Sequence, residues 1–367
     1  MIYLSCDYHY GAHPKVLEAL AKYNTEPNIG YGKDPHCVNA ARMIRRACAG
    51  QTVDKADSQK VQVDDKALEA LMDVHFLVGG TQTNTTIIAA ALRPYQGVIT
   101  AETGHINVHE TGAIESVGHK VIALSGVDGK LSATQIEACV KAHESSSSHE
   151  HMVMPKMVYI SNPTEIGSIY SKEELEAISS VCRAHGLYLF MDGARLGYGL
   201  TSDANDLTLE DITKACDVFY IGGTKCGAMF GEAVVITHPE LKENFRYMIK
   251  QRGGMLAKGW LLGVQYEALM TDNLYFDICR QANEQAARIK AALLEKGFKF
   301  TVDSPTNQLF VMLPKALIEV LSEKYILNDD NPTSPKICRE VRICTSWAST
   351  DEEVDALIED IKAWEIK

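Results

Sequence analysis

Short apolar runs alternate with amphipathic segments through the first two thirds of the chain. The segment 171–186 predicts a helix, because Ser171 and Glu174 have capping-box spacing and Gly186 suits the position after the helix end. Buried strands are predicted at VHFLV (74–78), KMVYI (156–160), LYLFM (187–191), VFYIG (218–222) and EAVVI (232–236). This strand–helix–strand repetition favours an α/β fold with a mostly parallel sheet covered on both faces.

The pattern changes at about Leu241 and becomes mainly helical. The chain ends in an amphipathic helix with Val354, Leu357, Ile358 and Ile361 on one side. We therefore expect a large domain over residues 1–240, with an N-terminal arm, and a smaller C-terminal domain over 241–367. Residues 143–155 (HESSSSHEHMVMP) are typical of a solvated loop.

Composition narrows the function classes. The 367 residues are 46% hydrophobic and carry a net charge of −12, so a nucleic-acid partner is not indicated. No apolar run approaches the ~18–20 residues that span a bilayer, and the N-terminus lacks the features of a signal peptide. The ten cysteines include no Cys-x-x-Cys pair, so we expect free thiols in a reducing cytoplasm, with no metal site and no membrane association.

Two charged residues follow predicted strands. Asp192 ends LYLFMD, with Arg195 just beyond, and Lys225 follows VFYIG in the small-residue stretch YIGGTKCGAMFG. In open α/β sheets, ligands bind outside the carboxyl ends of the strands. Asp192 could instead start a turn or cap a helix, and the two charges could simply form an ion pair. The glycines around Lys225 favour a bulky ligand, because they let backbone approach it closely.

A third strand runs into Gly79-Gly80-Thr81 and then into a predicted helix. Backbone N–H groups at a helix N-terminus bind anions, although an ordinary glycine-rich turn would have the same sequence. An anion cradle, a carboxylate and a lysine together match the phosphate, pyridine nitrogen and aldehyde of pyridoxal 5′-phosphate.

Histidines and glutamates crowd the segment 101–113, which contains Glu102, His105, His109 and Glu110. Their spacing differs from the HExxH of zinc proteases. A structural histidine is one interpretation, and an imidazole lying against a flat cofactor ring is the other.

These features resemble fold-type I pyridoxal-phosphate enzymes, and within them the threonine aldolase / aromatic amino acid β-eliminating lyase family, over almost the whole chain. The similar segments are MDGARLG (191–197), YGKDP (31–35), GGTQTN (79–84), Glu102-x-x-His105-x-x-x-x-Glu110, VRICTSW (341–347) and RGGMLAKGWLLG (252–263).

The resemblance implies a large sheet domain with a smaller C-terminal α+β domain, and cleavage of a β-hydroxy-α-amino acid to glycine and an aldehyde. It implies that Lys225 bonds the cofactor aldehyde, Asp192 holds the pyridine nitrogen and His105 stacks on the ring. Further cofactor contacts are expected from Gly80, Thr81, Arg195 and Thr224. Arg342, with Arg195, is expected to bind the substrate carboxylate. The segment 252–263 implies a homo-oligomer, a dimer or a tetramer, with shared active sites.

The chain departs from the family pattern at two places, and its Thr-Glu-x-Gly segment (164–167) resembles that of a divergent bacterial subgroup. Cys6 stands where the family usually has a serine near the substrate carboxylate, and ISNPTEIGSIYS (160–171) lacks the usual histidine. Glu165 becomes a candidate to face the substrate hydroxyl, with His105, His109 or water as other bases. Alternatively, Glu165 caps the turn before Ser171 or pairs with a cation.

Two further functions remain open on the same residues. One is another pyridoxal-phosphate reaction, such as β-elimination or transamination. The other is a non-catalytic binding protein, which the joint presence of Asp192, Arg195 and Lys225 disfavours.

Overall fold

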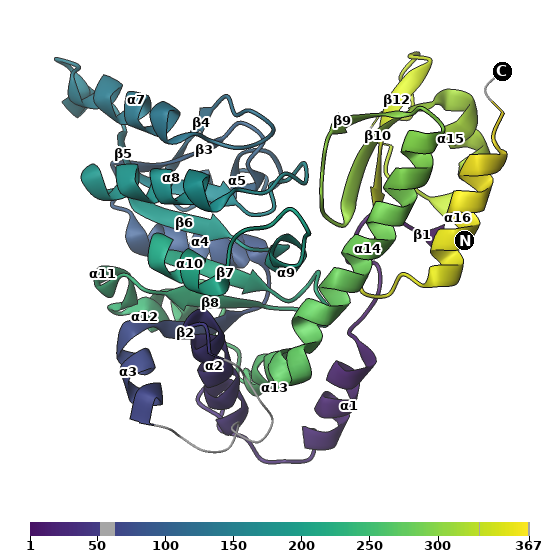
Figure 1. Ribbon diagram of the computed structural model, residues 1–367. Coiled ribbons are helices and arrows are strands. Elements are labelled where there is room, and N and C mark those ends of the chain that lie inside the picture. The colour runs from purple at the N-terminus through teal and green to yellow at the C-terminus, as the bar shows by residue number, and fades with distance from the viewer. Residues whose placement is uncertain (52–62, 330, 366–367) are drawn as a thin grey trace.

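A seven-stranded sheet lies at the centre of the larger part of the molecule (Figure 1). The computed structural model describes residues 1–51, 63–329 and 331–365. The strands lie in the order β2-β8-β7-β6-β5-β3-β4, and only β8 runs antiparallel to its neighbours. Their bounds are β2 (Asp73–Leu77), β3 (Gln96–Ala101), β4 (Lys120–Leu124), β5 (Met154–Ser161), β6 (Tyr188–Asp192), β7 (Val218–Gly222) and β8 (Glu232–Ile236).

Helices cover both faces of this sheet, as the sequence predicts. Alternate residues of β6 enter different cores, with Leu189 and Met191 in one and Tyr188 and Phe190 in the other. The helices before residue 272 are α1 (Pro14–Tyr23), α2 (Pro35–Cys48), α3 (Val63–Leu71), α4 (Gly80–Ala91), α5 (His105–Val108), α6 (Ala113–Ser116), α7 (Ala133–Glu144), α8 (Lys172–Ala184), α9 (Leu196–Leu200), α10 (Leu209–Ala215), α11 (Pro239–Lys242), α12 (Phe245–Gln251) and α13 (Trp260–Met270).

A smaller antiparallel sheet lies to one side, and the long helix α14 (Leu274–Glu295) runs toward it from the large sheet (Figure 1). Its own core gathers side chains from these strands and helices around Leu4. The elements are β9 (Lys299–Val302), β10 (Gln308–Pro314), α15 (Lys315–Leu321), β12 (Cys338–Cys344) and α16 (Asp351–Ala363), together with the parallel pair β1 (Ile2–Tyr3) and β11 (Tyr325–Ile326).

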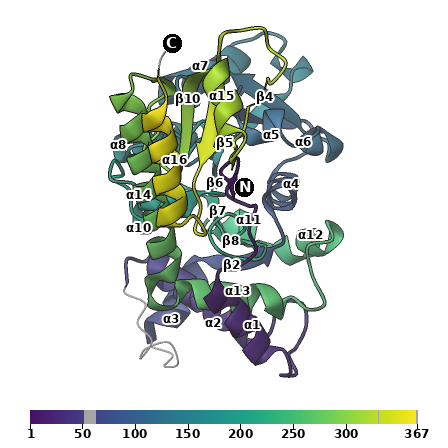
Figure 2. The same cartoon turned by 90° about the vertical axis from the view of Figure 1, so that its right-hand side faces the viewer.

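The N-terminal segment runs from the small sheet down to α1 and bonds to both parts of the molecule (Figure 2). The Cys344 amide donates to the Leu4 carbonyl oxygen over 2.7 Å on the small-sheet side. The His13 amide then donates to the Gly227 carbonyl oxygen over 2.9 Å on the large-sheet side. Residues 5–12 therefore lie where both parts of the molecule can contact them.

The sequence-based expectations agree with most elements. Ser171 and Glu174 form the expected capping box of α8, and Val354, Leu357 and Ile361 are the buried face of α16. The loop expected at 143–155 is shorter, because α7 continues to Glu144 and β5 begins at Met154.

The domain boundary near residue 240 stays a prediction, and α13 beyond it packs against α1 and α2. Within the described ranges, no helix is both long enough and apolar enough to cross a bilayer.

Two glycines bring the ends of β6 and β7 unusually close. A Cβ atom on Gly193 would lie 1.8 Å from the Tyr220 carbonyl oxygen, and one on Gly222 would lie 2.4 Å from the Ala194 carbonyl oxygen. The Gly222 amide donates to the Gly193 carbonyl oxygen over 2.9 Å. This contact fixes the residues that follow each strand.

We expect Gly193→Ala to destabilise the protein by at least about 1–3 kcal/mol, because the added methyl group meets rigid backbone. Urea unfolding followed by circular dichroism measures the effect. Gly11→Ala is the control, because its Cβ would meet only the Met229 side chain at 3.8 Å. Equal unfolding midpoints for the two variants would contradict the close-packing argument.

Candidate active site

A cavity of ≈ 300 Å³ opens at the carboxyl edge of the large sheet. The chain segments that follow the parallel strands β2, β3, β5, β6 and β7 all contribute to its wall. The antiparallel strand β8 contributes its first residue, Glu232, at the same edge. The cavity thus occupies the place where open α/β sheets bind ligands.

Asp192, the last residue of β6, is a fixed hydrogen-bond acceptor in this cavity. Its Oδ1 accepts from the Ala194 amide over 2.9 Å. Its Oδ2 accepts from the Tyr159 hydroxyl and from the Asn84 side chain, the latter over 3.3 Å. Three donors directed at one carboxylate hold its orientation.

Lys225 enters the cavity from the loop after β7. Its Nζ lies 6.0 Å from the centre of the Tyr8 ring. Burial and the nearby Arg195 charge lower the pKa of Lys225, while Asp7, Asp192 and Glu232 oppose that shift. The neutral amine, which is the nucleophilic form, is therefore easier to reach than for a surface lysine.

Arg195 forms a buried, two-point ion pair with Asp7 of the N-terminal segment. The Nε–Oδ2 distance is 2.7 Å and the second guanidinium nitrogen lies 2.9 Å from Oδ1. The Asn307 side chain also donates to Asp7, over 3.0 Å. Arg195 lines the cavity, and these two bonds direct two of its five N–H donors at Asp7.

His105 is the first residue of α5 and lies on the cavity wall. Its Nδ1 lies 2.8 Å from Oε1 of the buried Glu110, which also accepts from Asn84 over 2.7 Å. These contacts fix the orientation of the imidazole. They also link His105 to Asp192, because Asn84 donates to both Glu110 and Asp192. The nearby His109 is exposed and lies outside the cavity lining.

Glu165 is the second carboxylate on the wall. Its Oε1 accepts from the Ser161 hydroxyl over 2.6 Å and from the His105 amide over 2.8 Å. Burial raises the pKa of Glu165 above its ordinary value. Glu165 does not cap α8 itself, because the Glu174 side chain accepts from the Ser171 amide over 2.8 Å. A cap of the turn before Ser171 stays a prediction.

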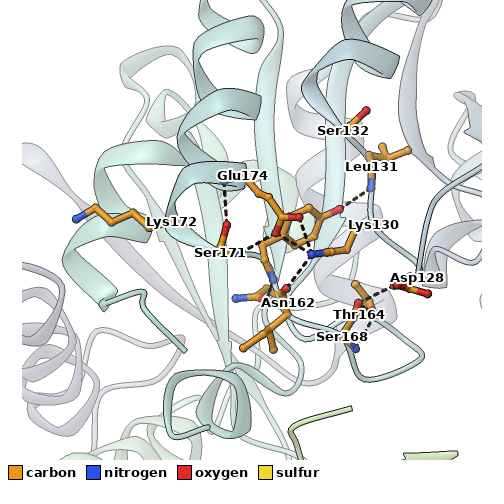
Figure 3. A network of polar contacts seen from close by, with 12 residues as sticks. Asp128, Lys130, Leu131, Ser132, Asn162, Thr164, Ser168, Ser171, Lys172 and Glu174 are labelled. Carbon is orange, nitrogen blue, oxygen red and sulfur yellow. Dashed lines mark hydrogen bonds and ion pairs between the residues drawn. The ribbon is translucent and has the colours of Figure 1, made fainter. Parts of the chain in front are cut away.

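The loop 162–170 that carries this carboxylate is held from behind, as Figure 3 shows. Ser168 donates to the Asp128 carbonyl oxygen over 2.6 Å. Lys130 donates to the Ile169 carbonyl oxygen over 3.3 Å and also binds Glu174 of α8 over 2.6 Å. These contacts lie outside the cavity lining, so they support the loop without entering the site.

The expected anion cradle faces the same cavity. Gly80 is the first residue of the 12-residue helix α4, and Gly79, Gly80 and Thr81 all line the wall. A Cβ atom on Gly79 would meet nothing within 4 Å, so open space lies beside the backbone. Free N–H groups at this helix start can bind an anion.

Two expected substrate contacts, Cys6 and Arg342, are absent from the cavity lining. Arg342 lies on β12 and donates to the Ser5 carbonyl oxygen over 3.0 Å. Its Nε is buried and has no hydrogen-bond partner among the described residues. An unsatisfied guanidinium N–H of this kind suits an anionic ligand.

The structure thus brings together all seven cofactor residues that the sequence predicts: Gly80, Thr81, His105, Asp192, Arg195, Thr224 and Lys225. Their individual roles stay predictions. Asp7, Tyr8, Tyr159 and Glu232 were not predicted from the sequence. Only Glu232 gave a visible signal, as a charged residue heading an otherwise apolar strand.

The donor set fits pyridoxal phosphate. A fixed carboxylate suits the pyridine nitrogen, a lysine with a lowered pKa suits the aldehyde, and a helix start suits the phosphate. All three belong to one cavity.

Comparison with known proteins agrees with this assignment. A low specificity L-threonine aldolase of a Pseudomonas species is 28% identical over 97% of this chain and 96% of its own length. A solved threonine aldolase of Leishmania major is 45% identical, with a TM-score of 0.90 over 99% of both chains. The aspartate aminotransferase of Thermus thermophilus is 15% identical, covers 99% of this chain and 91% of its own, and shares the fold with a TM-score of 0.67.

Residues 14–316 match the beta-eliminating lyase family. The protein is accordingly a lyase that uses pyridoxal phosphate on the fold-type I scaffold. By a match that extends over most of its length, the chain belongs to the beta-eliminating lyase family.

Proposed function

We propose that this lyase cleaves a β-hydroxy-α-amino acid of the L-threonine, L-allo-threonine or phenylserine type into glycine and an aldehyde. The observation that carries the proposal is the 45% identity, over 99% of both chains, with the threonine aldolase of Leishmania major. The cavity supports it, because it combines groups for the cofactor with carboxylate and imidazole groups for proton transfer.

Each residue has a proposed task. Bound pyridoxal phosphate supplies an electron sink next to the substrate α-carbon. Lys225 holds the cofactor and carries protons, and its lowered pKa suits both tasks. Asp192 keeps a proton on the pyridine nitrogen, and Arg342 binds the substrate carboxylate through donors that include its unsatisfied Nε.

The test is a panel of β-hydroxy amino acids given to the cofactor-loaded enzyme, with glycine and aldehyde measured together. We expect equal amounts of both products, and a fall of at least about 10²-fold in Lys225→Ala. Borohydride reduction should attach the cofactor to Lys225. A keto acid in place of glycine would contradict the proposal and indicate β-elimination or transamination.

Glu165 is proposed to take the proton from the substrate β-hydroxyl. It lies on the cavity wall, and its contacts with Ser161 and His105 use only Oε1. Because burial raises its pKa, turnover that depends on its ionised form should increase with pH through that raised value.

We expect Glu165→Gln to reduce kcat by about 10²–10⁴-fold and to remove this rising limb of the pH profile, with cofactor affinity unchanged. Glu102→Gln is the matched control, because Glu102 is exposed and lies outside the cavity lining. Unchanged turnover in Glu165→Gln would return the proton transfer to His105, His109 or water.

A homo-oligomer with shared sites is proposed from exposed side chains and from the segment 252–263. Tyr8 lines the cavity yet is 55% exposed, and Tyr247 of α12 is 77% exposed. Large exposed aromatic side chains favour contact with another chain. Lys258 is also exposed, in the segment 252–263 that is expected to complete a neighbouring site.

Mixing two inactive variants, Lys225→Ala and Lys258→Ala, tests this sharing. If each site uses residues from two chains, mixed dimers contain one intact site and should restore about a quarter of wild-type activity. Lys141→Ala, on the remote helix α7, should be active by itself. A monomer in analytical ultracentrifugation, or full activity of Lys258→Ala, would contradict shared sites.

The ten cysteines are all free, and most are buried. This supports a location in a reducing cytoplasm, which we propose for the enzyme.

A further inference from the structure

Glu232 is a buried carboxyl group that the cofactor contacts described so far do not use. It is 3% exposed and lines the cavity. It is the first residue of β8, where it pairs with Leu77 of β2 on one side and Gly222 of β7 on the other. Because β8 is antiparallel, its start lies at the edge where the neighbouring strands end.

This register places Glu232 between two parts of the cofactor site. Leu77 ends β2, and the chain continues from it into the Gly79–Thr81 cradle and α4. Gly222 ends β7, and the chain continues from it into Thr224 and Lys225. A carboxyl group therefore lies beside the expected phosphate position, where a negative charge is unfavourable.

The contacts of Glu232 do not neutralise such a charge. Its Oε1 accepts from the Thr224 hydroxyl over 2.8 Å, and its Oε2 from the Gly223 amide over 3.2 Å. Within the described ranges, no lysine, arginine or histidine nitrogen lies within 4.0 Å of it.

Other titratable groups surround Glu232 from several elements. Lys225 favours its ionised form and Asp192 opposes it, while the hydroxyl groups of Tyr220 on β7 and Tyr266 on α13 are also affected by its charge. Burial outweighs the favourable contacts and raises the pKa of Glu232 to about 8. A phosphate anion in the cradle would raise it further.

We propose that Glu232 is a neutral acid in the cofactor-loaded enzyme and that its hydroxyl group donates a hydrogen bond to the cofactor phosphate. The proposal concerns how the site recognises the phosphorylated cofactor and is independent of which amino acid is cleaved. Protonation of the Glu232 carboxyl group has a measurable consequence. Above the pKa of the empty site, phosphate binding must take up one proton, so Kd should increase about tenfold per pH unit.

The probe is 4-deoxypyridoxine 5′-phosphate, which lacks the aldehyde and so cannot bond Lys225. Its Kd is measured by calorimetry from pH 6.5 to 9.5, beside 4-deoxypyridoxine without phosphate. Glu232→Gln keeps the shape and a donor while removing the titration. We expect wild-type Kd for the phosphorylated probe to increase more steeply above pH 8 than that of the variant.

This difference in pH dependence between wild type and Glu232→Gln should disappear with 4-deoxypyridoxine, the probe without phosphate. The two proteins should also bind the phosphorylated probe within about threefold of each other at pH 6.5, where both present a neutral donor. Asp217→Asn is the matched control, because burial raises the pKa of Asp217 too, but it lies at the opposite end of β7 and outside the cavity lining. It should keep the wild-type pH dependence.

Equal pH dependence in wild type and Glu232→Gln would overturn the proposal. So would a loss of affinity in Glu232→Gln that is the same at every pH, because that result indicates an ionised Glu232 paired with a cation. If the variant fails to fold, wild-type calorimetry in buffers of different ionisation enthalpy counts the protons. The proposal requires about one proton taken up at pH 9 and none near pH 6.5.

Discussion

The buried ion pair between Asp7 and Arg195 joins the parts from which the active site is built. Asp7 belongs to the N-terminal segment, Arg195 follows β6 of the large sheet, and Asn307 approaches from the side of the small sheet. Burial alone would raise the pKa of Asp7, but the Arg195 and Lys225 charges and two hydrogen bonds hold it below its ordinary value. A charge buried this deeply must remain paired. The N-terminal segment is therefore fixed against both sheets, and it places Tyr8 near Lys225.

Positively and negatively charged side chains line one small cavity because the strands that carry them each have an end at the same edge of the sheet. Five of the parallel strands, β2, β3, β5, β6 and β7, each deliver one polar segment to the same edge. Most residues of β3, β5, β6 and β7 are themselves apolar and buried. Burial in the cavity then shifts the pKa values of three of its ionisable groups toward neutral pH. The pKa of Lys225 decreases, whereas the pKa values of Glu165 and Glu232 increase. Neutral forms of all three become available nearer to neutral pH than they are in water.

The sequence predicted the sheet and most of the cofactor cavity because both depend on local patterns. Asp192 and Lys225 directly follow apolar runs, and the position of a strand end is enough to place them. Asp7 could not be found in this way, since its partner Arg195 is 188 residues away. Tyr159 lies within an apolar strand and looks like core, although its hydroxyl group donates to Asp192. The strands β9, β10 and β12 escaped individual prediction, because a small antiparallel sheet lacks the repetition that marks the parallel one.

The antiparallel direction of β8 makes the site sensitive to strand register. Glu232 faces the cavity only because Leu77 and Gly222 pair with it on either side. A slip of one residue would reverse every side chain of β8, directing the Glu232 carboxyl group away from the cavity and bringing Ala233 toward it. In this enzyme the pairing that holds the sheet together is also what selects the chemical character of one cavity wall.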